Sequence, residues 1–272
     1  MARLGKIRNG QETSVPIQPD GQAVNENVTR EHYARLAATY DQNWAHSPEF
    51  VAWMTGCIQQ RLRITGADQV IDIGCGTGLY ARELALDAAS VVCADSSAPM
   101  LAQLPHDGRL TAVNASAEDL ASGRVRLPAE RFDAMLVKEV LHHVEDQGQV
   151  IGGLARLLKP GGRMLVAMLP ATISYPLFAS ALELFTRQQP DPADIAAQMR
   201  AAGLEAELAY ESFPLEFPAE RYLQMVRDRH MSLLSHFSDA ELEAGVAEIR
   251  RDHPGDQISF EDRFAFVLGV KA

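Results

Sequence analysis

Alternating glycines form the most distinctive chemical pattern in this sequence. Gly74, Gly76 and Gly78 follow directly on the apolar run of residues 70–73. Glycine has no Cβ, so a turn built from it bends tightly and lets a ligand approach the backbone closely. The carboxyl end of a buried strand is also where open α/β sheets bind their ligands. The pattern predicts a cofactor-binding turn; a purely structural glycine turn is the alternative.

Two carboxylates accompany these glycines. Asp72 lies inside the apolar run, just before the first glycine, and Asp95 ends the next apolar run. A phosphate gains nothing from the negative charge of Asp72, whereas an ammonium or a sulfonium does. Asp95 follows the glycines by about 20 residues, the offset at which an acid accepts hydrogen bonds from ribose hydroxyls. Asp95 could instead cap the following helix through Ser96 and Ser97.

A second group of residues could move a proton. Glu139, His142 and His143 are spaced so that they share one face of a helix or tight turn. A histidine is the usual proton acceptor near neutral pH, and the glutamate could orient an imidazole. The alternative for the histidines is packing or hydrogen bonding. These ligand types also suit Zn or Fe. Nothing else in the chain supplies a matching second group of metal ligands, so we predict no metal.

A third candidate group lies in the amphipathic stretch 222–232. Arg227 and Arg229 are two residues apart and cannot both face the same side. If one of them points into a cleft, it could clamp a carboxylate or a phosphate. Surface salt bridges to nearby acidic residues are the alternative.

Short β-rich runs alternate with helical stretches through the centre of the chain. The expected strands are 69–73, 90–94, 110–113, 134–137 and 163–168, and the expected helices are 79–86, 99–104 and 151–158. Such alternation predicts right-handed βαβ units, hence a parallel sheet with helices on both faces. The edge of that sheet would bring the candidate residues together.

The two ends of the chain depart from this alternation. Residues 1–27 show no apolar period, so we expect a flexible arm. Helices then precede the sheet, one of them beginning at Ser47-Pro48, where the serine can cap. Later in the chain a helix is expected at 191–202 and strands at 205–211 and 263–271. The remaining segments, 170–190 and the mostly helical 214–252, are the size of a lid on a domain that spans 28–272.

Composition narrows the function classes. The 272 residues are 47% hydrophobic, which suits one α/β domain, and the net charge of -11 argues against a phosphate backbone as partner. The longest apolar runs, 164–170 and 264–270, are far short of the roughly 20 residues that span a bilayer. No signal segment opens the chain. We therefore expect a cytoplasmic protein with a small-molecule partner, which binds neither nucleic acid nor a membrane. The sequence leaves open whether the protein forms a homodimer.

Taken as a set, these motifs resemble the class I S-adenosylmethionine-dependent methyltransferases, especially the small-molecule enzymes of ubiquinone and menaquinone biosynthesis. The resemblance runs from about residue 33 to residue 166. It is carried by the glycine signature 72–78, Asp95, and the segments 132–135, 141–143 and 157–162.

The resemblance implies a Rossmann-like, doubly wound α/β fold: a mostly parallel seven-stranded sheet with its last strand antiparallel, N-terminal helices and a helical C-terminal lid. It implies S-adenosylmethionine as methyl donor, S-adenosylhomocysteine as product, and in-line transfer to an O, N or C nucleophile of a small molecule. A non-catalytic S-adenosylmethionine-binding protein is the alternative. A nicotinamide-dependent oxidoreductase and a protein or nucleic-acid methylase fit the motifs and the charge less well.

The resemblance also implies roles for single residues. Asp72, Gly74 and Gly76 would hold the methionine end of the donor, in a site that also includes Cys75, Gly78 and Ser96. Asp95 would hold the ribose, Met100 would lie against the adenine, and Ala117 and Glu118 would approach the adenine edge. Lys138 would contribute backbone to the methionine, and Tyr40 would close over the donor, unless it only packs a helix. One departure is Ser116, which stands where family members often have an acid.

Overall fold

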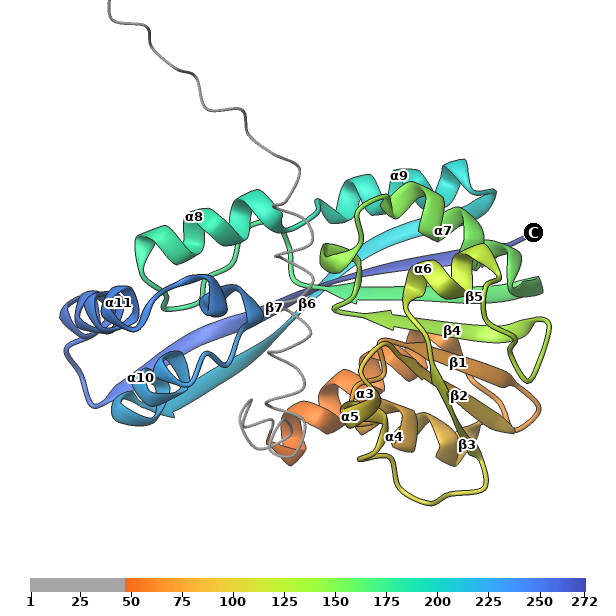
Figure 1. The fold of residues 1–272 in the computed structure, drawn as a ribbon, viewed down its shortest axis with the longest axis horizontal. Coiled ribbons are helices and arrows are strands. Elements are labelled where there is room, and N and C mark those ends of the chain that lie inside the picture. The colour runs from red at the N-terminus through yellow and green to blue at the C-terminus, as the bar shows by residue number, and fades with distance from the viewer. Residues whose placement is uncertain (1–46) are drawn as a thin grey trace, which may run out of the picture.

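The computed structural model describes residues 47–272 (Figure 1). The expected arm and Tyr40 lie outside the described residues. The helices are α3 (Pro48–Leu62), α4 (Leu79–Asp87), α5 (Ala98–Leu101), α6 (Ala117–Ser122), η1 (Leu141–His143), α7 (Gln147–Arg156), α8 (Ala179–Gln188), α9 (Pro192–Ala201), α10 (Ala219–Arg227), η2 (Ser232–His236) and α11 (Asp239–Asp252). The strands are β1 (Gln69–Ile73), β2 (Ser90–Asp95), β3 (Leu110–Asn114), β4 (Phe132–Lys138), β5 (Leu158–Met168), β6 (Leu204–Pro218) and β7 (Gln257–Lys271).

The strands of the described chain form one sheet of seven, in the order β3-β2-β1-β4-β5-β7-β6. Strands β1 to β5 pair in parallel, whereas β7 pairs antiparallel with both β5 and β6. The predicted fold class, including the antiparallel last strand, is confirmed. The strand order reverses between β1 and β4, and such a switch point opens a crevice at the carboxyl ends of the strands.

Alternate residues of the buried strands feed two separate cores. On one face, Val70 of β1 and Leu136 of β4 pack with the apolar stripes of α3 and α4. On the other face, Ile71 and Met135 pack with α6, α7 and α9. Figure 1 shows the two helix layers on either side of the sheet. Helix α3 begins as predicted, since the Ser47 side chain accepts a hydrogen bond from the Phe50 N–H at 3.2 Å.

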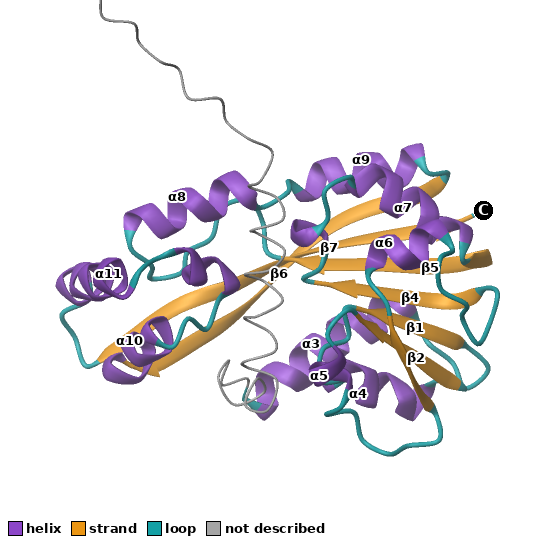
Figure 2. Ribbon diagram, in the orientation of Figure 1, coloured by secondary structure: helices purple, strands orange, loops and turns teal. Residues whose placement is uncertain are grey.

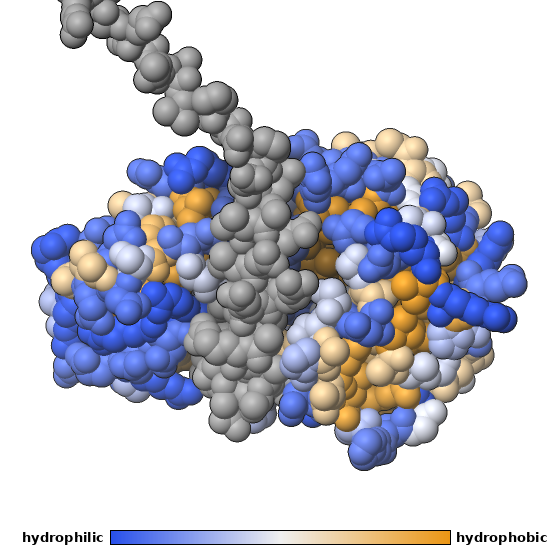
Figure 3. All heavy atoms as spheres, in the orientation of Figure 1, coloured by the Kyte–Doolittle hydropathy of each residue, from blue (hydrophilic) through white to orange (hydrophobic). Residues whose placement is uncertain are grey.

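Strands β6 and β7 are much longer than the strands beside them. The β5 strand pairs with β7 only over residues 163–168, opposite 265–270, so residues 257–264 pair with β6 alone. This projecting hairpin and the helices α8, α10, η2 and α11 form what we call the hairpin lobe (Figure 2). In the view of Figure 3, hydrophilic side chains cover most of the lobe's visible surface over α10 and α11.

The long hairpin corrects the expected end of β6. The sequence predicted a strand at 205–211 and a mostly helical segment from 214, outside the alternation of strands and helices. In the structure β6 continues to Pro218, which pairs with Gln257. The physical reason is that β6 lies at the edge of the sheet, and an edge strand tolerates proline where its missing N–H would face away from the ladder. Within the described residues, no helix has the length and apolar character to cross a bilayer.

Candidate functional site

The glycine turn between β1 and α4 uses left-handed backbone. Gly74, Gly76 and Gly78 have φ angles of 71°, 57° and 80°, a region that disfavours residues with a Cβ. The Gly74 N–H donates to the carbonyl of Ala94 at 2.8 Å, which fastens the turn to the end of β2. Gly74 is exposed to solvent. The turn therefore presents open backbone at the switch point of the sheet.

Asp95 joins the glycine turn to the next βα turn. Its Oδ2 accepts a hydrogen bond from the Gly76 N–H at 2.9 Å, and its Oδ1 accepts one from the Ser97 N–H at 2.7 Å. The capping alternative is thus partly realised. Each carboxylate oxygen retains a second lone pair for a ligand. Burial raises the pKa of Asp95, although the two N–H groups oppose that shift.

Asp72 is a buried charge on β1. Only 3% of it is exposed, and it points to the same face of the sheet as Val70. Desolvation, reinforced by the negative charge of Asp95 and opposed by Lys138, raises the pKa of Asp72 to about 7. A carboxylate that is costly to ionise alone gains most from a cationic ligand beside it.

The other predicted donor residues lie at the same edge of the sheet. Met100 is buried in α5, and Ala117 is buried at the start of α6, where Glu118 is half-buried. Cys75 and Gly78 are buried within the glycine turn, whereas Ser96 is exposed. Ser116 is the N-cap of α6, which explains why a serine suits that position. The structure therefore brings the predicted donor residues in the described chain to one edge, including the backbone of Lys138 at the end of β4.

Glu139 has a structural contact in place of the predicted contact with a histidine. Its backbone is left-handed, with φ of 54°, and its Oε1 accepts a hydrogen bond from the Leu169 N–H at 2.7 Å. This bond ties the end of β4 to the segment that follows β5. The carboxylate is therefore engaged with backbone.

His142 and His143 lie side by side in η1, with ring centroids 3.9 Å apart. Desolvation lowers the pKa of His142 to about 4 and also lowers the pKa of His143. A base of such low pKa takes a proton poorly at neutral pH. Within the described residues, the buried Nδ1 of His142 has no hydrogen-bond partner, and no group of three residues could hold a metal ion.

Arg227 and Arg229 reach α11, away from the glycine turn. Arg227 Nε lies 2.9 Å from Glu243 Oε1, and an Arg229 guanidinium nitrogen lies 2.7 Å from Asp239 Oδ1. This arrangement is the salt-bridge alternative that the sequence left open. Neither arginine enters the site that the structure assembles.

Sequence reasoning missed a polar cluster between the sheet and the hairpin lobe. The Tyr175 hydroxyl donates to Asp262 Oδ1 at 2.6 Å, and Asp262 is only 1% exposed. Burial raises the pKa of Asp262 to about 7. One signal could have revealed this aspartate, because it occupies a core position in the alternation of Phe260, Asp262, Phe264 and Phe266 along β7.

Lys138 extends from the end of β4 towards this cluster. Its Nζ lies 5.2 Å from the centroid of the Tyr80 ring and 5.1 Å from that of the Phe264 ring. Burial lowers the pKa of Lys138, while the nearby charges of Glu139, Asp262 and Asp72 raise it. The sequence predicted only a backbone role for this residue.

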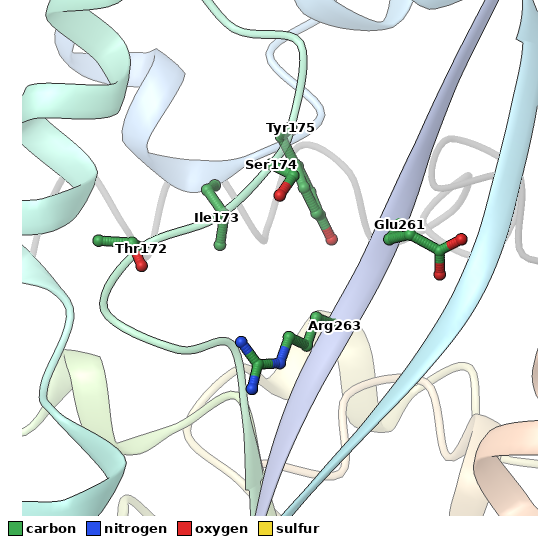
Figure 4. A pocket seen from close by; sticks show the side chains of 6 residues that line it. All are labelled: Thr172, Ile173, Ser174, Tyr175, Glu261 and Arg263. Atoms are coloured by element: carbon green, nitrogen blue, oxygen red, sulfur yellow. The ribbon is translucent and has the colours of Figure 1, made fainter.

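A small cavity opens beside Tyr175. It has a volume of about 140 Å³ and is lined by residues of the segment 172–175 and by Glu261 and Arg263 of β7. Figure 4 shows the Tyr175 hydroxyl directed towards β7 and the Arg263 guanidinium directed towards the 172–175 segment. The cavity and the polar cluster therefore share Tyr175.

Comparisons with known proteins agree with this geometry. Residues 71–166 match the family model described as a methyltransferase domain. A ubiquinone biosynthesis O-methyltransferase from Pseudomonas syringae pv. tomato is 31% identical over 205 residues, covering 66% of this chain and 84% of the relative. The corresponding protein of Xylella fastidiosa is 34% identical over 171 residues, covering 55% of this chain.

The chain spans 65% of the Xylella protein's length. Among solved structures, the YcgJ protein from Bacillus subtilis superposes with a TM-score of 0.57 at 19% identity, covering 81% of this chain and 98% of that one. This last likeness concerns the fold alone. From the sequence relatives, the matching domain and the glycine turn with its two carboxylates, the chain belongs to the class I S-adenosylmethionine-dependent methyltransferases.

Proposed function

We propose that this protein transfers a methyl group from S-adenosylmethionine to a small-molecule acceptor. The observation that carries the proposal is the glycine turn, exposed at Gly74, with Asp72 and Asp95 beside it at the switch point of the sheet. Two carboxylates at this position suit a ligand that carries positive charge and a ribose. A pyrophosphate would be repelled by the same pair.

The residues fit this donor. Asp95 keeps lone pairs for ribose hydroxyls, and Asp72 offers negative charge to the ammonium and the sulfonium. The buried Ser97 hydroxyl has no partner within the described residues and supplies a further polar group beside Asp95. Met100, Ala117 and Glu118 would hold the adenine. When bound, the donor supplies a methyl group on a positively charged sulfur.

The chain's own contribution is mainly to position the two reactants. Methyl transfer needs the nucleophile in line with the bond that breaks, so fixed geometry accounts for much of the rate. The glycine turn (residues 72–78) and Asp95, which we call the donor half, are tied to each other by hydrogen bonds, so this part of the site is formed before any ligand arrives. We propose that the hairpin lobe acts as the lid that supplies the acceptor half.

Two observations support oxygen as the atom that is methylated. The sequence relatives are named ubiquinone biosynthesis O-methyltransferases. In addition, the buried carboxylate of Asp262 interacts with Lys138 at the end of β4, and an O–H nucleophile must lose its proton to such a group.

Calorimetric titration with S-adenosylmethionine and S-adenosylhomocysteine tests the proposal. We expect both ligands to bind the wild-type protein, and Asp95→Ala to weaken both by about 100-fold, because two charged hydrogen bonds to ribose would be lost. Asp107→Ala is the matched control, since Asp107 is paired with Arg109 before β3, away from the carboxyl edge. If neither ligand binds the folded wild-type protein, the proposal is wrong.

A further inference from the structure

The cluster between the sheet and the hairpin lobe contains polar groups whose hydrogen bonds are incomplete. Within the described residues, Lys138 Nζ makes no hydrogen bond and no ion pair; two aromatic rings flank it. The Tyr222 hydroxyl of α10 is likewise buried without a partner there. An ammonium that loses water and gains no acceptor is costly. Both groups can donate, so a ligand with acceptor atoms would satisfy both.

The strand pairing places Lys138 between the donor half and the hairpin lobe. Leu136 pairs with Asp72 in the register of β4 and β1, so Lys138 lies on the same face, two residues nearer the carboxyl edge. On its other side, Lys138 pairs with Ala167, which pairs in turn with Phe266 of β7. Asp262 lies on the Phe266 face of β7, further out along the hairpin. Lys138 therefore stands between the donor half and the lobe.

Asp262 is suited to accept a proton. Its Oδ1 is held by the Tyr175 hydroxyl. Lys138 at the end of β4, Glu139 just after it and Tyr222 from α10 also face this carboxyl group. Burial raises its pKa to about 7, which matches a proton acceptor that works near neutral pH. His142, with a pKa of about 4, is a weaker candidate for the same task.

We propose that the Lys138 ammonium binds the oxygen of the methyl acceptor as an anion, and that Asp262, positioned by Tyr175, takes the proton that this oxygen gives up. The acceptor's O–H bond breaks and its proton passes to the Asp262 carboxylate. The oxygen then forms a bond to the methyl carbon as the carbon–sulfur bond breaks, and that electron pair stays on sulfur. This inference rests on the proposed function and adds the residues that activate the acceptor.

The test uses 4-nitrophenol as a probe, because its anion alone is yellow. It is titrated into wild-type protein saturated with S-adenosylhomocysteine, and the absorbance reports both binding and ionisation. We expect the bound phenol to ionise at lower pH than the free phenol. Lys138→Met should remove that shift and weaken binding of the anion by about tenfold or more. The matched control Lys159→Met removes a lysine that is paired with Asp133, and it should change neither quantity.

Asp262→Asn should have the opposite effect from Lys138→Met on binding of the phenol anion. It removes a negative charge near Lys138, so the pre-ionised phenol should bind as tightly as in the wild type or more tightly. A merely structural role for the cluster would weaken binding in both variants. Melting temperature and S-adenosylhomocysteine titration check the fold of each variant, and Lys138→Gln carries the same expectation if the methionine variant does not fold.

Three results would overturn the inference: no binding of 4-nitrophenol by the wild-type complex, unchanged binding in Lys138→Met, or equal weakening in Lys138→Met and Asp262→Asn. A failure of the proposed function looks different. In that case the folded wild-type protein would not bind S-adenosylhomocysteine in the first place.

Discussion

The donor half and the hairpin lobe are built in different ways. In the donor half, the glycine turn and Asp95 are about 20 residues apart, and the connection between them is a single βα unit. In the lobe, Tyr175 and Asp262 are 87 residues apart and meet only because a long hairpin folds beside the segment that follows β5. A local turn carries its function in a short motif, whereas the lobe depends on the whole chain being in place.

This difference explains how far the sequence could predict the molecule. The sheet, its helices and the carboxyl-edge location of Asp72, Gly74 and Asp95 followed from local periodicity and turn chemistry. The length of β6 did not, because edge position in the finished sheet overrides the effect of Pro214. Lys138 was predicted for its backbone alone, since the direction of its side chain depends on the placement of Phe264. The roles of these residues stay predictions.

The largest effect on the free energy of unfolding should come from giving one glycine of the donor half a Cβ atom. A Cβ at Gly74 would lie 2.2 Å from Val140 Cγ2, on backbone with φ of 71°. Gly74→Ala should lower the free energy of unfolding by roughly 2 to 4 kcal/mol, through overpacking and backbone strain. Gly76→Ala is the matched control: it shares the positive φ but meets nothing within 4 Å, so about 1 kcal/mol is expected. Urea denaturation measures both, and equal losses would show that Val140 yields easily.

A smaller change in the free energy of unfolding, of opposite sign, is expected when Asp72 is replaced. Its pKa is about 7 in the folded protein against an ordinary value of 3.8, so the folded state keeps the proton up to a higher pH than the unfolded chain does. Ionisation of this group therefore opposes folding as pH rises from about 4 to 7. Asp72→Asn should raise the free energy of unfolding by about 2 kcal/mol at pH 8 and hardly at all near pH 4.

Denaturation of wild type and Asp72→Asn at both pH values measures this difference. The same variant should bind S-adenosylmethionine more weakly, because the cation loses its carboxylate. A variant that is less stable than the wild type at pH 8 would show that Asp72 is a structural partner and not a charge held ready for a ligand.

The smallest effect should come from the outer side of the lobe. Arg227 pairs with Glu243, and both side chains keep contact with solvent, so Arg227→Ala should cost less than about 1 kcal/mol of stability. Donor binding should be unchanged. A clear loss of acceptor or donor binding in this variant would show that Arg227 contributes to the binding site. The outer surface of the lobe would then not be functionally distinct from its interior.

The most direct test of the division between the two halves is calorimetric titration of S-adenosylhomocysteine into Asp95→Ala and Asp262→Asn side by side. Our account predicts that Asp95→Ala loses binding while Asp262→Asn binds within about twofold of the wild type, because the carboxylates serve different ligands. Loss of binding in a folded Asp262→Asn variant, or unchanged binding in Asp95→Ala, would contradict it.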